Sequence, residues 1–205
     1  MLKIWGRINS INVQKAVLGA EETGVAYERI DAGAAFGKNK TPEYLAMNPN
    51  GLVPVLQDGA FHLFESNAIV RYLAAKHSDG KLWPGEAHAR AHADQWMDWQ
   101  TTALTPAMHG AFWALIRTPE AQRDPAVIEA SRVKAEEILT ILDAHLATHE
   151  WMAGGAVSVA EIAVVCAVHR WLHLPLKREK RAHIERWYKS YMTRPAGKIL
   201  PLPVT

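Results

Sequence analysis

The chain has 205 residues, of which 49% are hydrophobic and 21% are charged, and its formal net charge is +2. This balance is ordinary for a globular protein, and no apolar run reaches the ~18–20 residues of a membrane helix, so we expect no membrane partner. The single cysteine, Cys166, excludes an internal disulfide and a CxxC redox pair. The start of the chain lacks the apolar stretch of a secretory signal, so we expect a cytoplasmic protein.

Up to about residue 80, short strands and helices alternate. Residues 2–5 predict a strand, residues 12–24 a helix and residues 26–31 a second strand. Residues 41–47 predict a short helix with Pro42 in its first turn. Residues 53–57 and 61–64 predict a hairpin around Asp58-Gly59, and residues 65–77 predict a helix. The order β-α-β-α-β-β-α predicts a small mixed sheet with helices on its faces.

After a linker, the rest of the chain is predicted to be helical. Apolar residues recur at helical spacing over residues 87–115 and 126–149, and the capping box Ser158-Val-Ala-Glu161 predicts a helix through Trp171. A last helix is expected from about Lys177 to Met192. We therefore expect a domain over residues 1–78, a linker over 79–86 and an all-helical domain over 87–205.

Three groups of residues are expected to have structural or solvent-exposed roles rather than to form a functional site. Cys166 lies in an apolar helical pattern and is expected to be a small buried hydrophobe. Three histidine pairs have i,i+4 spacing without an evident third ligand, so we expect structural or solvated histidines and no metal: His88/His92, His145/His149 and His169/His173. Basic residues crowd the region 177–198, and we expect a solvated helix face there rather than a nucleic-acid site.

The stretch NPNGLVPVLQDG, residues 48–59, places Pro54 inside an expected strand. Proline cannot donate to a sheet ladder, so either the strand is an edge strand or the bond before Pro54 is cis. A β-α-β-α-β-β-α order with a proline opening the third strand is the thioredoxin-like pattern. With the helical half, the whole chain resembles the cytosolic glutathione transferase family, most specifically through NPNGLVPVLQDGAFHLFESNAIVRYLA (48–74) and SVAE (158–161). The start, GRINSINVQKA, resembles theta-like and nu-like bacterial members.

This resemblance implies an α+β thioredoxin-like domain that binds glutathione as co-substrate without a metal, followed by an all-α domain. It implies a cis bond before Pro54, with the backbone of Val53 paired to the cysteine of glutathione. Glu65 and Ser66, at a helix start, would hold the γ-glutamyl end. Lys38 is favoured over Lys40 for the glycyl carboxylate, because Leu52 stands where many relatives have a basic residue.

The thiol-activating residue is left between two candidates. No tyrosine precedes Tyr27 and no cysteine lies near the N-terminus, which leaves Asn9, Ser10 and Asn12. By the resemblance, Ser10 matches the theta-like serine and Asn12 the nu-like asparagine. Either side chain would donate a hydrogen bond to the glutathione thiolate, Ser10 being favoured; either could instead only cap the helix, and backbone amides could carry the activation.

The segment TPAMHGAFW, residues 105–113, supplies an apolar wall for a hydrophobic electrophile: Met108, His109, Phe112 and Trp113. The expected function is glutathione transfer to such an electrophile. The alternatives are a glutathione-dependent disulfide or peroxide reductase, as in nu-like members, and a non-catalytic protein-interaction module of the same fold. Family members usually form two-fold dimers, so a homodimer is expected.

Overall fold

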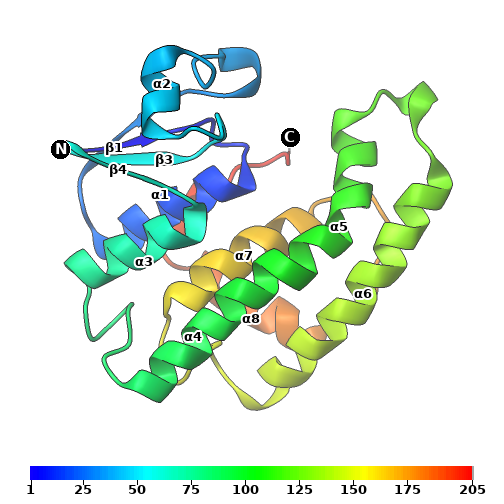
Figure 1. The fold of residues 1–205 in the computed structure, drawn as a ribbon. Coiled ribbons are helices and arrows are strands. Elements are labelled where there is room, and N and C mark those ends of the chain that lie inside the picture. The colour runs from blue at the N-terminus through cyan, green and yellow to red at the C-terminus, as the bar shows by residue number, and fades with distance from the viewer. Residues whose placement is uncertain (205) are drawn as a thin grey trace.

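The computed structural model describes residues 1–204, and its amino-terminal part is a sheet flanked by helices (Figure 1). Its elements are β1 (Leu2–Trp5), α1 (Ile11–Thr23), β2 (Tyr27–Ile30), α2 (Pro42–Met47), β3 (Val55–Asp58), β4 (Phe61–Phe64) and α3 (Ser66–His77). The strand order is β2-β1-β3-β4; β1 runs parallel to β2 and antiparallel to β3, and β3 runs antiparallel to β4. The predicted element order is confirmed.

Pro54 lies just outside the sheet. Strand β3 begins at Val55 and runs between β1 and β4, so the edge-strand alternative is wrong. The strand also starts two residues later than its predicted start at Val53. The Val53–Pro54 bond is cis, as the resemblance implied. Proline therefore precedes the ladder and removes no hydrogen bond from it.

Helix α1 lies between the sheet and the helical half of the chain (Figure 1). Its predicted apolar face packs in one cluster with Leu2, Ile4 and Leu56 of the sheet; that face consists of Val13, Ala16, Val17 and Ala20. Ile11 and Leu18 point the other way and belong to the core of the helical half. Because both faces are buried, the start of α1 is held rigidly between the two layers.

The second half is helical, with α7 at its centre (Figure 1). Its helices are α4 (Ala87–Trp99), α5 (Thr105–Phe112), α6 (Pro125–Thr148), α7 (Val159–Leu172) and α8 (Ala182–Met192). The helix predicted over 87–115 is interrupted by π-helical turns at Gln100–Leu104 and Trp113–Arg117. Such turns widen a helix locally and are common at functional sites. Cys166 is fully buried in α7, as predicted.

The predicted capping box opens α7. The Ser158 amide and hydroxyl both donate to Oε2 of Glu161, at 2.7 and 2.8 Å, and the Ala160 amide donates to the Ser158 hydroxyl at 3.3 Å. The Met152 amide donates to the other carboxylate oxygen at 2.5 Å. Complete burial raises the pKa of the Glu161 carboxyl, while these donors act in the opposite direction. The motif thus ties the preceding loop to the central helix.

The last helix begins at Ala182, five residues later than predicted. One cause is a carboxylate from α6: Oδ1 of Asp143 accepts from the amides of His183 and Ile184, at 3.2 and 3.0 Å, and so caps α8 there. The other is the buried pair of Arg181 with Glu136, whose side chains are 12% and 6% exposed. This pair pulls the chain before α8 against α6 in an extended form.

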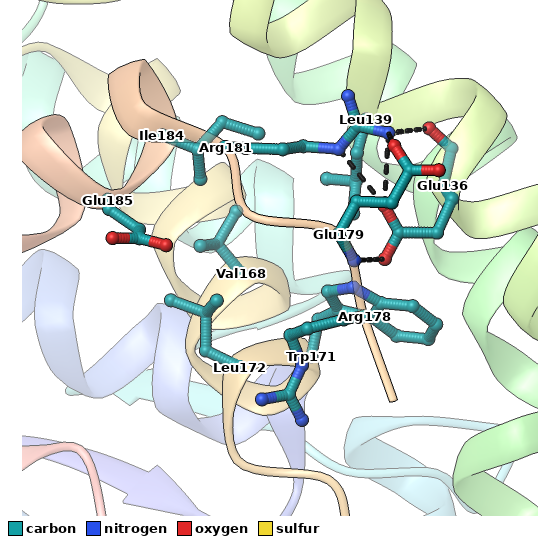
Figure 2. Close-up of a pocket in the computed structure, with 10 residues that line it drawn as sticks. All are labelled: Glu136, Leu139, Val168, Trp171, Leu172, Arg178, Glu179, Arg181, Ile184 and Glu185. Carbon is teal, nitrogen blue, oxygen red and sulfur yellow. Dashed lines mark hydrogen bonds and ion pairs between the residues drawn. The ribbon is translucent and has the colours of Figure 1, made fainter. Parts of the chain in front are cut away.

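The expected solvated basic face is wrong for Arg181, whose side chain is only 12% exposed, while Arg186 is exposed, as expected. Figure 2 shows Arg181 bonded to Glu136 and to Glu179 in a pocket between α6, α7 and the segment before α8, which Trp171 also lines. Arg186 donates to the carbonyl oxygen of Leu146 at 2.5 Å. Arg194 forms a two-pronged pair with Glu22 of α1, at 2.8 and 2.7 Å. These positive charges hold the helices together. Within residues 1–204, no helix combines the length and apolar character needed to cross a bilayer.

Candidate functional site

The amino ends of α1 and α3 lie side by side, joined by a side-chain hydrogen bond. The Ser66 hydroxyl, in the first turn of α3, donates to Oδ1 of Asn12 in the first turn of α1 at 3.2 Å. Ser10 is the N-cap residue of α1, but its side chain makes no capping bond. Helix amino ends present free N–H groups and a positive dipole end, which favours a negatively charged ligand. Here the amino ends of α1 and α3 both face the region around Ser66 and Asn12.

Val53 approaches this region because Gly6 has no side chain. A Cβ at Gly6 would lie 2.4 Å from Cγ2 of Val13 and 3.2 Å from Cβ of Val53. Among the described residues, no hydrogen bond uses the amide or carbonyl of Val53. The preceding carbonyl, of Leu52, accepts from the Tyr44 hydroxyl at 2.8 Å. The turn is thus anchored on one side, and the backbone of Val53 remains able to pair with an extended ligand.

Glu65 has an unusual backbone conformation directly before α3. Its φ is +71°, in a region that residues other than glycine seldom adopt, and its side chain is exposed. Such backbone conformations gather at ligand clamps, where surrounding structure holds them in place. Glu65 and the buried Ser66 are therefore adjacent but differ in access: the carboxylate can reach outward, while the hydroxyl is turned toward Asn12.

Asn67 holds the first turn of α3 in position. Its amide nitrogen donates to the carbonyl oxygen of Met97 in α4 at 3.0 Å, and its Oδ1 accepts from Nζ of Lys15 at 3.2 Å. Lys15 is 2% exposed. Burial lowers the pKa of Lys15 to about 8, partly opposed by the charge of Glu65. Sequence reasoning missed both residues; a lysine on the same side of the helix as the apolar Ile11 and Leu18 was the available signal.

The two candidate lysines lie differently. Lys38 is exposed and has a φ of +63°. Lys40 folds over the turn before Val53, since a Cβ at Gly51 would lie 2.6 Å from its Nζ. The structure therefore brings the ammonium of Lys40 close to the Val53 turn, whereas the sequence favoured Lys38.

Three of the four residues predicted for the electrophile wall line one small, partly open pocket. Met108, His109 and Phe112 line it together with Ile11, Thr105 and Arg170. Ile11 follows Ser10 directly, so the pocket opens next to the start of α1. Trp113 is outside this lining; it is 55% exposed and stacks on the His109 ring at 5.6 Å between centroids.

Arg170 of α7 is the functional candidate that sequence reasoning missed. Its guanidinium lies over the Phe112 ring, 3.9 Å from the centroid, and its Nη2 donates to the carbonyl oxygen of Asn9 at 3.3 Å. Burial lowers the pKa of Arg170 to about 10, partly opposed by Cys166 and assisted by the charges of Arg117 and Arg7. An arginine at the end of the apolar run EIAVVCAVHR was the signal that could have found it.

The histidine pairs have separate surroundings. His145 and His149 stack at 4.2 Å, and His169 is hydrogen-bonded to the Tyr188 hydroxyl at 2.8 Å. His88 is exposed and lies 3.1 Å from a carboxylate oxygen of Glu86. Within residues 1–204, no three histidine, cysteine or acidic side chains gather in a way that could hold a metal ion.

The structure combines a thioredoxin-like sheet, a cis-proline turn beside two helix amino ends, and an adjoining helical half. This combination defines a class of glutathione-binding proteins that have a thioredoxin-like part and a helical part. The comparisons with known proteins agree. The family model described as glutathione S-transferase, N-terminal domain, matches residues 1–75, and the one described as the C-terminal domain matches residues 104–195. The chain belongs to the glutathione S-transferase family, is a glutathione transferase, and uses glutathione as co-substrate.

Individual relatives cover all or nearly all of the chain. Glutathione S-transferase GstB of Escherichia coli is 42% identical over 208 residues, which span 100% of both proteins. Glutathione S-transferase 4 of Zea mays is 32% identical and covers 96% of this chain and 90% of its own. The theta class enzyme of Xanthomonas axonopodis pv. citri, solved with glutathione bound, has a TM-score of 0.96 and 44% identity, covering 100% of this chain and 99% of its own. These likenesses confirm the resemblance to bacterial glutathione transferases.

Proposed function

We propose that the protein activates glutathione as a thiolate at the start of α1 and directs it at an electrophile in the Met108–Phe112 pocket. The observation that carries this proposal is the junction of the two helix amino ends through Ser66 and Asn12, 3.2 Å apart. Beside it stands the hydroxyl of Ser10, whose side chain makes no capping bond.

Glutathione recognition is proposed to use both helix starts. The backbone of Val53, set by Pro54, pairs with the cysteine of glutathione. Glu65 accepts from its ammonium group, and the amide groups at the start of α3 with Ser66 hold the γ-glutamyl carboxylate. Lys38 and Lys40 are the candidates for the glycyl carboxylate; the proximity of Lys40 to Gly51 supports Lys40.

The Ser10 hydroxyl is proposed to donate to the thiolate sulfur. A hydrogen bond to a charged group is worth ~1.5–3 kcal/mol, which corresponds to a thiol pKa lowered by roughly one to two units. The dipole of α1 acts in the same direction. Ser10 thereby favours the thiolate without attacking the substrate itself.

With an aryl halide as electrophile, the balance of the reaction is simple. The glutathione sulfur forms a bond to the ring carbon, the carbon–halogen bond breaks with its electron pair, and halide leaves. The thiol proton passes to solvent. Met108, His109 and Phe112 supply the apolar wall, and Trp113, stacked on His109, extends it outward.

Retention on glutathione resin followed by three assays tests this function. We expect conjugation of an aryl halide to exceed reduction of an organic peroxide and of a mixed disulfide. Faster disulfide or peroxide turnover would instead support the reductase alternative, for which the pair Ser10 and Asn12 is the supporting feature. Retention on the resin without any turnover would support a non-catalytic interaction module.

The working unit is proposed to be a cytoplasmic homodimer, with the domain limits 1–78 and 87–205 predicted from the sequence. The gap between α3, which ends at His77, and α4, which begins at Ala87, supports these limits. Light scattering behind a sizing column tests the dimer, since a monomer mass at working concentration would contradict it.

A further inference from the structure

Thr105 differs from every other helical threonine that the structure describes. A threonine inside a helix usually turns its hydroxyl back and donates to a carbonyl oxygen of the preceding turn. The other helical threonines do so, with oxygen–oxygen distances from 2.9 to 3.3 Å: Thr23, Thr101, Thr102, Thr140 and Thr148. Among residues 1–204, the Thr105 hydroxyl donates to no protein atom, and the hydrogen bond that it makes is one that it accepts from the side-chain amide nitrogen of Gln100.

The cause lies in the π-helical turn Gln100–Leu104, which directly precedes α5. Pro106 has no N–H, and its ring would clash with the carbonyl of the residue four positions back, so an α-helical turn cannot continue undisturbed through it. The helix is wider here: the Thr105 amide bonds to the carbonyl oxygen of Gln100, five positions back. This turn also brings the side chain of Gln100, which is 1% exposed, into contact with the Thr105 hydroxyl.

The direction of the bond from Gln100 leaves the Thr105 proton available. An amide nitrogen can only donate, so the Thr105 oxygen is the acceptor, and a hydroxyl still has one donor to use. The other end of the amide is also held, because Oε1 of Gln100 accepts from the Thr101 hydroxyl at 3.4 Å. Thr101 in turn accepts from Nδ2 of Asn67, at the start of α3, at 3.1 Å. The unused donor of Thr105 is therefore held in position rather than turned back into the helix.

This donor belongs to the lining of the proposed electrophile pocket. Thr105 lines it together with Met108, Phe112 and Ile11, and Ile11 directly follows Ser10. A molecule that fills the pocket therefore contacts both the wall that carries the hydroxyl and the start of α1, where the thiolate is proposed to form. Because Thr105 is half-buried, water competes less for its proton than at an open surface.

We propose that Thr105 determines substrate specificity by donating a hydrogen bond to the carbonyl oxygen of an α,β-unsaturated carbonyl compound. This inference rests on the proposed transferase function and narrows its substrate class. The thiolate sulfur forms a bond to the β-carbon, the electron pair of the carbon–carbon double bond moves toward the carbonyl group, and negative charge collects on the carbonyl oxygen. The Thr105 hydroxyl stabilises this oxyanion and keeps its own proton, and solvent then protonates the α-carbon. No group leaves, and the product is a saturated thioether.

Two electrophiles test the inference: benzylideneacetone, an aryl enone, and benzyl chloride, which has no oxygen. Thr105→Val keeps the shape of the side chain and removes the hydroxyl. It should lower the ratio of kcat/KM for the enone to that for the chloride about tenfold or more, whereas Thr105→Ser should keep the ratio within about twofold. Thr102→Val, the matched change at an exposed position of the same π-helical turn, should leave the ratio unchanged. An unchanged ratio in Thr105→Val would overturn the inference while the transferase function stands.

Three further variants separate donation by Thr105 from other causes. Gln100→Glu offers Thr105 a carboxylate acceptor, so the hydroxyl should turn to it and the ratio should fall although Thr105 is present. His109 and Arg170 also line the pocket and can donate, so His109→Phe and Arg170→Met are the competing variants. Loss of the enone preference in either of these, with none in Thr105→Val, would assign the donor elsewhere and overturn the inference.

Direct binding separates this inference from the function on which it rests. If neither electrophile is turned over, the transferase proposal fails, and the unreactive saturated ketone benzylacetone is studied by infrared difference spectroscopy on the glutathione-loaded protein. A carbonyl stretch at lower frequency in the parent protein than in Thr105→Val would still support the hydrogen bond from Thr105. Equal frequencies in the two proteins, or no binding of the ketone, would overturn it.

Discussion

The Ser66 hydroxyl donates to Oδ1 of Asn12 at 3.2 Å, joining the first turns of two helices whose bonded residues are 54 positions apart. This bond uses the acceptor oxygen of Asn12, and the side chain of Ser10 makes no capping bond with its helix. We propose separate roles for the two candidates. Asn12 orients the side chain of Ser66 beside the proposed γ-glutamyl site, and Ser10 donates to the sulfur; Nδ2 of Asn12 is the competing donor.

Replacing Ser10 with alanine should raise the pKa of bound glutathione and slow turnover near neutral pH. Loss of a hydrogen bond to a thiolate corresponds to about ten- to hundredfold in turnover there. Above pH ~9 the defect should shrink, because the thiol then ionises without help. Thiolate absorbance titrated against pH measures the shift directly.

Asn12→Ala is the matched control for this titration. It should weaken glutathione binding, because the Ser66 side chain loses the partner that orients it, and it should cause little shift in the thiolate curve. If Asn12→Ala shifts the curve and Ser10→Ala does not, Asn12 is the donor. If neither variant shifts it, backbone amides at the start of α1 activate the thiol and no side chain does.

Glu65→Gln should have the opposite kinetic signature. The exposed carboxylate is proposed to accept from the glutathione ammonium, so its loss should weaken glutathione binding about tenfold or more. The pKa of the glutathione that still binds should change little. Calorimetric titration with glutathione measures the affinity, and Glu43→Gln, which removes an exposed carboxylate from the first turn of α2, serves as control. Equal affinity for Glu65→Gln and the parent would remove Glu65 from the site.

Lys15→Met should stabilise the protein near neutral pH. Burial lowers the pKa of Lys15 to about 8, whereas a lysine in an unfolded chain titrates near ~10.4. Below both values the folded state must bury the charge, and the lysine then costs about 1–3 kcal/mol of the free energy of unfolding. As pH rises from ~8 to ~10.4, the folded state loses its proton first and the parent protein recovers this stability.

Urea unfolding of Lys15→Met and the parent across this pH range measures the difference. The variant should be more stable at neutral pH, and its advantage should disappear by about pH 10.4. Lys189→Met, at an exposed position, should show no such dependence on pH. An advantage for Lys15→Met that stays constant with pH would mean that packing, rather than ionisation, explains it.

The buried pair of Glu136 and Arg181 should show strong non-additivity. Arg181→Met leaves Glu136 buried and unpaired, which should cost about 3–5 kcal/mol of the free energy of unfolding. The double variant Glu136→Leu/Arg181→Met removes both charges and should recover most of that loss. Lys134→Met, which removes one partner of an exposed pair with Glu137, should cost less than ~1 kcal/mol. Chemical denaturation of these variants and of the single variant Glu136→Leu gives the coupling energy, and simple additivity at 136 and 181 would contradict a tight ion pair.

The sequence by itself determined the order of the elements and the place of the cis-proline turn. Apolar spacing is a local property, so the face of α1 formed by Val13 and Val17 and the capping box at Ser158 and Glu161 could be predicted without any long-range contact. Pro54 likewise has a local effect, since a residue without an N–H cannot enter a ladder. The first residue of a helix was harder to predict from the sequence. Helix α8 begins later than predicted because Asp143, which is far away in the sequence, caps it.

Only the tertiary structure decided which charged groups meet. A periodic pattern shows which face of a helix is buried, but it does not show which of many possible partners a charge finds across the core. Spacing therefore could not show that Arg181 pairs with Glu136, or that Arg170, from the end of α7, lies over the Phe112 ring. Such meetings depend on how α1 packs against α7, which involves residues about 160 positions apart, as the bond from Arg170 to Asn9 illustrates. The cis-proline turn was accessible to local reasoning, and the arginine that lines the proposed electrophile pocket was not.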